Sequence, residues 1–256
     1  MMNFSIRSHN AWAPGIVGNA QWRAWAARPF VPRAGNAAPD LDFLPALQRR
    51  RLGPLARMAV ACAWPLAAAA APMPVVYASQ HGETSRGSAL LQTLVRDEPL
   101  SPTSFSLSVH NAIAGMWSIL RKETTESVAV SGLGDSLECG LTEASLLLQA
   151  GHESVMVIVA EESPPACYET WVRDVPFSYA VALHVTAGAG FHVRKIPHGS
   201  PRKAQAAPEP SASDAPPAPA APWPHALELV RHLMLGAPAW EHGAGSQGRW
   251  RWERQC

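Results

Sequence analysis

The sequence predicts an α/β protein in which helices cover both faces of a mixed, mostly parallel sheet. Three short apolar runs bounded by turn residues, PVVYAS (74–79), SVAVSG (127–132) and SVMVIVA (154–160), have the composition of strands buried on both faces. A segment with helical periodicity, 136–150, separates the second run from the third. Because a strand, a helix and a strand with short connections form a right-handed parallel crossover, we expect these strands in one sheet.

The other elements of the expected fold follow in chain order. FSI (4–6) predicts a short strand near the N-terminus, and residues 44–63 predict a helix entered at Pro54, because proline fits the first helical turn. SALLQTLVRD (88–97) has helical spacing of its apolar residues. SYAVALHVT (178–186) predicts a last strand, polar enough for a sheet edge. The expected sheet therefore has five strands.

The helix expected over 136–150 is apolar around most of its circumference. Its leucines are Leu137, Leu141, Leu146, Leu147 and Leu148. A helix of this kind is buried on all sides, so an uncovered face would favour a partner. Asp135 and Glu138 form a capping-box pattern at its start.

Composition divides the chain into three segments. Residues 1–195 carry the predicted fold. Residues 196–224 are rich in proline and alanine and predict an extended linker, since proline lacks the amide proton that helices and strands need. Residues 225–256 predict a C-terminal helix over HALELVRHLML (225–235), followed by a frayed tail. We consider this helix a candidate cover for part of the helix at 136–150.

Charge and cysteine usage exclude several function classes. With 21 basic and 20 acidic residues, the formal net charge is +1, which argues against a nucleic-acid partner. The longest apolar stretch, 58–72, contains Pro65 and is shorter than the ~20 residues of a membrane span, and the N-terminus has no signal-peptide pattern. The cysteines show no metal-binding spacing, so we expect no metal, no cofactor and a reduced, cytoplasmic location. They are Cys62, Cys139, Cys167 and Cys256.

A glycine turn joins the strand SVAVSG to the helix that follows. Gly132 and Gly134 flank Leu133, but a dinucleotide-binding fingerprint needs a third glycine where Leu137 stands. The Gly-Lys-Ser/Thr of a phosphate loop and the Gly-x-Ser-x-Gly of a hydrolase elbow are also missing. What remains is a helix N-terminus whose backbone amides favour negative charge and lower the pKa of a thiol placed there. The position carries glycine.

The segment around this turn resembles the central part of a β-ketoacyl synthase, the condensing enzyme of fatty-acid and polyketide synthesis. The matching residues are Thr142-Glu143-Ala144 in the helix, Gly151-His152-Glu153-Ser154 at the break and Val155 to Ala160 in the strand. A second block matches at Pro102, Phe105, Asn111, Ala114, Gly115, Ser118 and Ile119, and RRRLGPLARMAVACA is similar to the family's early helix. Counting back from these matches places Gly134 where the family has its nucleophilic cysteine.

The resemblance covers about residues 3 to 190 and implies half of a thiolase-like fold. The second half, which supplies the family's two catalytic histidines, is absent. The chain therefore resembles the shortened, non-catalytic partner subunits called chain-length factors, as found beside aryl polyene synthases of Gram-negative bacteria. This implies a heterodimer with a full-length ketosynthase, which an acyl carrier protein reaches through the complex.

The resemblance also implies which residues serve the complex. The expected tunnel-lining residues are Phe105, His110, Asn111, Met116, Leu133 and Gly134. The family's strand before the turn is an edge that pairs across a dimer axis. The residues expected at that edge are Val128, Ala129 and Val130.

The residues themselves leave other functions open. His81 with Ser85, or His110 with Cys139, are alternative hydrolytic pairs, which would make the chain an independent acyl-thioester hydrolase or acyltransferase. The basic run 48–51 is an alternative contact for an acidic carrier protein, and a domain that only binds a carrier protein is a third reading.

Overall fold

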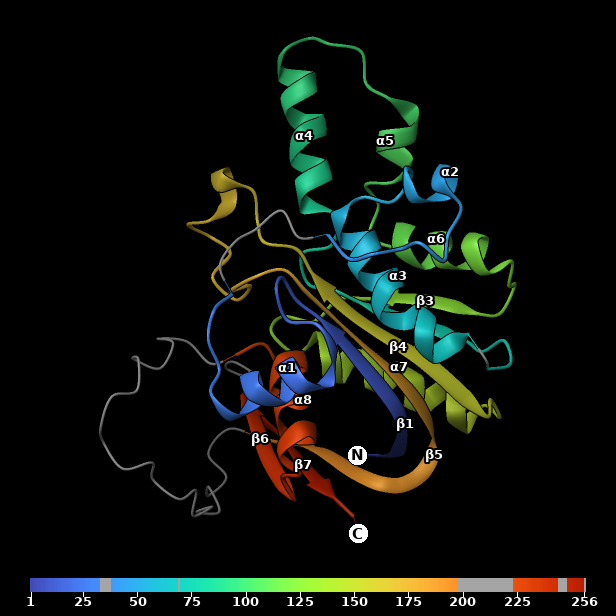
Figure 1. Cartoon of the computed structure of the whole chain (residues 1–256), viewed down its shortest axis with the longest axis vertical. Helices are drawn as coiled ribbons and strands as arrows, with labels where there is room; N and C mark the ends of the chain where they lie inside the picture. The colour runs from blue at the N-terminus through green and yellow to red at the C-terminus, as the bar shows by residue number, and fades with distance from the viewer. Residues whose placement is uncertain (33–37, 69, 198–222, 244–247, 256) are drawn as a thin grey trace.

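The computed structural model describes residues 1–32, 38–68, 70–197, 223–243 and 248–255 (Figure 1). The elements in chain order are β1 (Met2–Trp12), α1 (Gly18–Ala27), α2 (Ala46–Arg49), α3 (Pro54–Ala67), β2 (Val75–Ala78), α4 (Thr84–Val95), α5 (Pro102–Ser106), α6 (Ala112–Arg121), β3 (Ser127–Val130), α7 (Ser136–Gln149), β4 (Ser154–Glu161), the 3-10 turn η1 (Ala166–Tyr168), β5 (Tyr179–Ile196), α8 (His225–Leu235), β6 (Ala239–Gly243) and β7 (Arg249–Arg254).

The strands form one sheet in the order β3-β2-β4-β5-β7-β6, with β1 paired to β5. β2 runs parallel to β3 and β4, whereas the pairings of β5 with β1, β4 and β7, and of β6 with β7, are antiparallel. The sheet thus has seven strands in place of the predicted five, and most of its pairings are antiparallel. The difference arises because β5 continues to Ile196 and the C-terminal residues add two strands.

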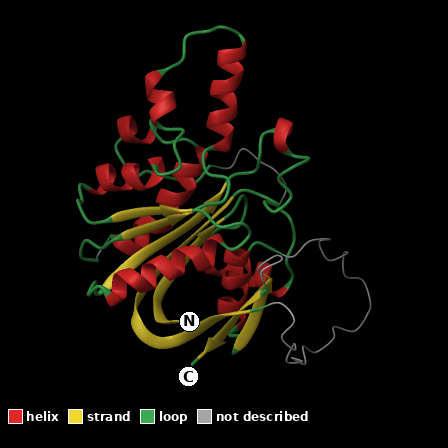
Figure 2. Ribbon diagram, turned by 180° about the vertical axis from the view of Figure 1, so that it is seen from behind, coloured by secondary structure: helices red, strands yellow, loops and turns green. Residues whose placement is uncertain are grey.

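Helices cover both faces of the sheet, as the sequence predicts (Figure 2). β4 shows how the two cores arise, because alternate residues of a strand point to opposite faces. Val157 packs in a core with α1, α7 and α8, and Met156 packs in a second core with α3 and α6. The α/β class with two covered faces is therefore confirmed. Within the described residues, no helix is long and apolar enough to cross a bilayer.

The expected edge at residues 178–186 is wrong, since β5 is a central strand. Its first half lies between β1 and β4, and its second half between β1 and β7 (Figure 1). His184, which suggests exposure in the sequence, is buried. β3 ends the sheet instead, and its residues Val128 to Val130 are only half-buried. The expectation of a strand buried on both faces is therefore wrong for β3.

The C-terminal residues are part of the sheet. The helix predicted over 225–235 is confirmed as α8, and it ends where Gly236 adopts φ +67°. The tail predicted to fray instead forms β7, in which Trp252 packs against Phe4, Phe191 and Trp240. Most of the predicted linker, 198–222, lies outside the described residues, so its character stays a prediction.

Helix α7 is covered mainly by the chain itself. Leu137, Leu141 and Leu147 are buried in the core that also holds Leu227 of α8, which agrees with the expected cover from the C-terminal helix. Leu146, in contrast, is 54% exposed. Burial on all sides is therefore wrong: α7 lies against the sheet with one face toward solvent.

Candidate functional site

The turn between β3 and α7 has the form of an elbow with glycine at its tip. Gly134 adopts φ +80°, a conformation that favours glycine, yet a Cβ atom at this position would meet no heavy atom within 4 Å. Gly132 differs, because its Cβ would lie 2.8 Å from Cys139 Sγ and 2.9 Å from the Ser136 nitrogen. Position 132 thus requires glycine because a Cβ atom there would clash with its neighbours, whereas position 134 favours glycine because of its positive φ angle.

The backbone amide of Gly134 already has an acceptor. It donates a hydrogen bond of 2.7 Å to Oε1 of Gln80, which follows β2. Asp135, the N-cap residue of α7, makes no side-chain cap hydrogen bond, so the predicted capping box does not form. Its carboxylate accepts instead from Nε1 of Trp250 at 3.2 Å.

A buried carboxylate fixes the loop that carries Gln80. Glu161, at the end of β4, accepts from the Gln80 amide at 2.5 Å, the His81 amide at 3.2 Å and the Ser79 hydroxyl at 3.0 Å. Burial raises the pKa of Glu161, against the hydrogen bonds from this loop. The loop therefore provides the donors that a buried carboxylate needs, and the carboxylate orients the loop.

The histidines near the turn are engaged in structural contacts. His81 Nε2 lies 2.9 Å from Asp174 Oδ1, and this hydrogen bond raises the pKa of His81. His110 Nε2 donates to the backbone oxygen of Ser79 at 2.8 Å. Ser85 bonds Glu162, so His81 and Ser85 do not act on each other. Both rings therefore stabilise the loop at residues 79–82.

Cys139 is not placed to act as a nucleophile at this turn. Its Sγ lies 3.7 Å from Asp135 Oδ1. Burial and the neighbouring Asp135 carboxylate raise the pKa of this thiol to about 11, so it stays protonated at neutral pH. His110 contacts Ser79 rather than this thiol. The second hydrolytic pair is therefore not formed either.

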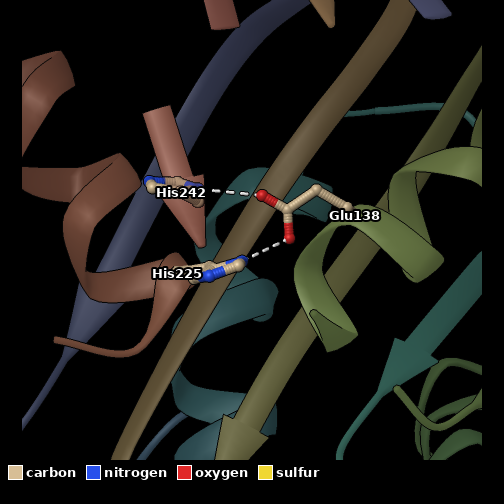
Figure 3. A group of neighbouring side chains, drawn as sticks. All are labelled: Glu138, His225 and His242. Carbon is tan, nitrogen blue, oxygen red and sulfur yellow. Dashed lines mark hydrogen bonds and ion pairs between the residues drawn. The ribbon is translucent and has the colours of Figure 1, made fainter. Parts of the chain in front are cut away.

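Glu138, in the first turn of α7, forms a buried cluster with two histidines from the C-terminal segment. Nδ1 of His225 lies 2.7 Å from Oε2, and Nδ1 of His242 lies 2.8 Å from Oε1 (Figure 3). Trp252 Nε1 donates to Oε1 at 3.1 Å. The Glu138 side chain is 0% exposed. Sequence reasoning missed this cluster because its residues come from α7, α8, β6 and β7, without short-range spacing.

Burial and hydrogen bonds shift the pKa values of all three side chains in the cluster. Hydrogen bonds from His225 and His242 overcome the opposing effect of burial and lower the pKa of Glu138 to about 2. Burial lowers the pKa of His242, whereas in His225 the hydrogen bond and charge of Glu138 outweigh burial and raise the pKa. Glu138 is therefore ionised at neutral pH, and the pKa values of its two histidine partners are shifted in opposite directions.

Within the described residues, Glu138, His225 and His242 also form a candidate metal-ligand group. The ring directions argue against a shared ion. The two imidazoles stack with centroids 4.4 Å apart and an interplanar angle of 26°, and each Nδ1 points to its own carboxylate oxygen (Figure 3). Metal ligands instead direct their lone pairs at one point. The geometry fits a hydrogen-bonded cross-link between α7 and the C-terminal segment.

The space beside the Gly134 turn is small. A cavity of about 50 Å³ is lined by residues that include Gln80, Gly134, Glu161, Tyr179 and His225. Pockets for drug-sized ligands measure roughly 300–1,000 Å³. An acyl chain therefore does not fit beside the turn in this conformation.

The predicted tunnel residues differ in their exposure to solvent. Phe105 is 62% exposed, Leu133 is 86% exposed and Asn111 is exposed, whereas His110 and Met116 are half-buried. They do not line one interior wall in this chain. Their role in a tunnel stays a prediction that involves a second subunit.

The fold and the turn define a protein of the thiolase-like, condensing-enzyme class in which glycine stands at the tip of the elbow. Residues 22–253 match the family described as β-ketoacyl synthase, N-terminal domain. The chain belongs to this family, as its resemblance to β-ketoacyl synthases implies.

Solved structures agree with this assignment. A chain from the ketosynthase (ApeO) in complex with its chain length factor (ApeC) from Xenorhabdus doucetiae is 30% identical, with a TM-score of 0.81 and coverage of 99% of this chain and 100% of that chain. Two further structures share the fold. The ishigamide ketosynthase/chain length factor is 18% identical, with a TM-score of 0.59 and coverage of 75% of this chain and 67% of that chain. A β-ketoacyl synthase from Burkholderia phymatum STM815 is 15% identical, with a TM-score of 0.56 and coverage of 77% of this chain and 65% of that chain. No curated protein matches the sequence.

Proposed function

We propose that the chain is a non-catalytic subunit that pairs with an active β-ketoacyl synthase and helps to shape its acyl tunnel. One observation carries this proposal: the turn between β3 and α7 has Gly134 where the family resemblance places the nucleophile, and the Gly134 amide donates to Gln80. A condensing reaction needs a nucleophile at this point, and neither Cys139 nor the nearby histidines are placed to supply one.

The partner follows from the relative that is 30% identical over nearly the whole chain. That structure is a ketosynthase in complex with its chain length factor. We infer a heterodimer with a full-length ketosynthase of a fatty-acid or polyketide pathway of the aryl polyene kind. The carrier protein then delivers acyl groups to the complex, where the ketosynthase holds the catalytic cysteine.

The surface of the chain supports a partner on the side of β3. β3 ends the sheet, and an unpaired strand edge favours pairing with another chain. Of 17 exposed large apolar residues in the described part of the chain, eight lie between residues 91 and 133. They are Leu91, Leu94, Val95, Leu100, Phe105, Val109, Ile119 and Leu133. This stretch of the chain includes the projecting helices α4 and α5 (Figure 1), and exposed apolar side chains of this number favour contact with a partner.

The same surface suggests how the subunit limits product length. Phe105 and Leu133 are exposed in the isolated chain, so their side chains are available to enter a cavity of the partner. Bulk at the far end of a tunnel stops chain growth by steric exclusion. Phe105→Ala and Met116→Ala are therefore expected to lengthen the product, whereas Leu235→Ala on α8 leaves it unchanged.

Co-expression with the ketosynthase encoded beside this chain tests the pairing. We expect the two proteins to elute together, and Ile119→Asp to weaken the complex by at least about tenfold, because a charge would be buried in an apolar interface. Val17→Asp is the matched control, since Val17 is equally exposed but lies before α1. Separate elution of the wild-type proteins, or equal loss in both variants, would contradict the proposal.

A further inference from the structure

We propose that Gln80 is an internal plug, by which we mean a side chain that blocks a binding position. Its carboxamide oxygen accepts the hydrogen bond of the Gly134 amide, and it thereby keeps acyl thioesters out of this chain's own turn. The inference deepens the proposed function and rests on it in one respect, namely that acyl groups belong in the partner's site. It concerns how this chain avoids competing with its partner for them.

The first step is the chemistry of the Gly134 amide. It lies just before α7, a helix of 14 residues, where backbone amides attract oxygen atoms with negative character. A carboxamide oxygen and a thioester carbonyl oxygen are both acceptors for such an amide. Gln80 Oε1 at 2.7 Å thus occupies the place that a thioester oxygen would need.

The second step is that Gln80 is held in this direction by its surroundings. Its own amide donates to Glu161, and the amide of the preceding Ser79 donates to the backbone oxygen of Val130 at 3.1 Å. His110 donates to the oxygen of Ser79. The backbone on either side of the Gln80 side chain is therefore fixed by contacts from β3, from β4 and from the loop before α6. The contact with Gly134 is built into the loop.

The third step is that the space beyond the plug is closed as well. Pro224, His225 and Ala226, at the start of α8, line the same small cavity as Gln80 and Gly134. His225 is anchored there by Glu138. Replacing Gln80 by a short residue would thus free the amide and add the volume of the side chain to the cavity.

Nuclear magnetic resonance of the ¹⁵N-labelled full chain tests the plug. The probe is the hexanoyl thioester of N-acetylcysteamine, added to millimolar concentration. In the wild type we expect a slowly exchanging Gly134 amide that the thioester does not shift. In Gln80→Ala, amide exchange should accelerate roughly fivefold or more, as expected for a lost hydrogen bond, and the Gly134 signal should shift saturably with the thioester.

Gln80→Asn is the second variant, because it keeps the carboxamide but shortens its reach, and it preserves the test if Gln80→Ala folds poorly. Gln92→Ala, at an exposed glutamine on α4, should behave as the wild type. A saturable shift in the wild type would overturn the inference. So would variants of Gln80 in which the exposed Gly134 amide ignores the thioester. Since the chain is measured alone, failure of the heterodimer would leave these outcomes unchanged and distinguishable.

Discussion

The carboxylate of Glu138 lies 2.7 Å from Nδ1 of His225, a residue 87 positions later in the chain. With His242 and Trp252, this contact joins the helix after the glycine elbow to the strands that complete the sheet. A buried carboxylate is costly when one of its hydrogen-bond donors is removed, because part of its charge is then left without a partner. The C-terminal segment is thus a structural part of the site.

Removing the carboxylate should destabilise the whole chain. We expect Glu138→Ala to lower the free energy of unfolding by about 3–5 kcal/mol, because it leaves the two buried histidine rings and the Trp252 N–H without their acceptor. Urea unfolding followed by tryptophan fluorescence measures the change. Glu143→Gln, on the same helix but partly exposed, should stay within about 0.5 kcal/mol of the wild type. Equal stability of Glu138→Ala and wild type would rule out the cross-link.

The cluster should also give the stability a defined pH dependence. The pKa of Glu138 is lowered from 4.5 to about 2, so its contribution is present above pH 4.5 and is lost as the pH falls toward 2. The lowered pKa of His242 acts in the same direction, from its unfolded value of 6.5 downward. The pKa of His225 is raised, so its contribution is complete below pH 6.5 and is lost as the pH rises through the higher folded value.

Unfolding free energies measured between pH 3 and pH 9 check this shape. The difference between wild type and Glu138→Ala should be largest near pH 5 to 6 and shrink toward both ends. A difference that is constant across this range would show that Glu138 is not ionised against His225 in the folded protein.

The indole hydrogen bond of Trp252 can be separated from its packing. Trp252→Phe keeps an aromatic ring beside Phe4 and Trp240 but removes the donor to Glu138, as well as part of the buried ring surface. We expect a loss of about 2–3 kcal/mol, since hydrogen bonds to charged groups are worth more than neutral ones. Trp171→Phe is the control, because Trp171 is 82% exposed. The same thermal midpoint for both variants would contradict this role.

The two glycines of the elbow should respond differently to substitution. Gly134→Ala meets no atom but must adopt φ +80°, so we expect a cost of about 1–2 kcal/mol. Gly132→Ala would place its Cβ against Cys139 and the Ser136 backbone, which should cost more. Chemical denaturation of both variants gives the order, and a more stable Gly132→Ala would reverse our assignment of their roles.

Local patterns were sufficient to predict much of the fold. The apolar runs that became β2 and β4, and the periodic segments that became α7 and α8, each carry their own signal. The polar residues of 178–186 indicate a sheet edge, but β5 is central and its His184 is buried. The sequence predicts a frayed end over β7, although its alternation of tryptophan and arginine has the period of two that is typical of a strand.

The candidate site also has a part that the sequence predicts and a part that it does not. The glycine elbow is visible in the sequence because its residues are adjacent, and the family resemblance predicts that Gly134 stands at the nucleophile's position. Gln80 and the Glu138 cluster are not visible, because their partners are separated by 54 and 87 to 114 positions. Only the three-dimensional fold brings such residues together. The capping pattern at Asp135 and Glu138 even indicated the wrong partners.

Acyl transfer in the assembled complex tests the central claim most directly. The complex of this chain with its ketosynthase would be incubated with an acyl-loaded carrier protein, and each subunit would then be weighed by intact-protein mass spectrometry. Our account requires the mass of an acyl group on the ketosynthase alone, with this chain unmodified. A covalent acyl adduct on this chain that continues to be elongated there would contradict it.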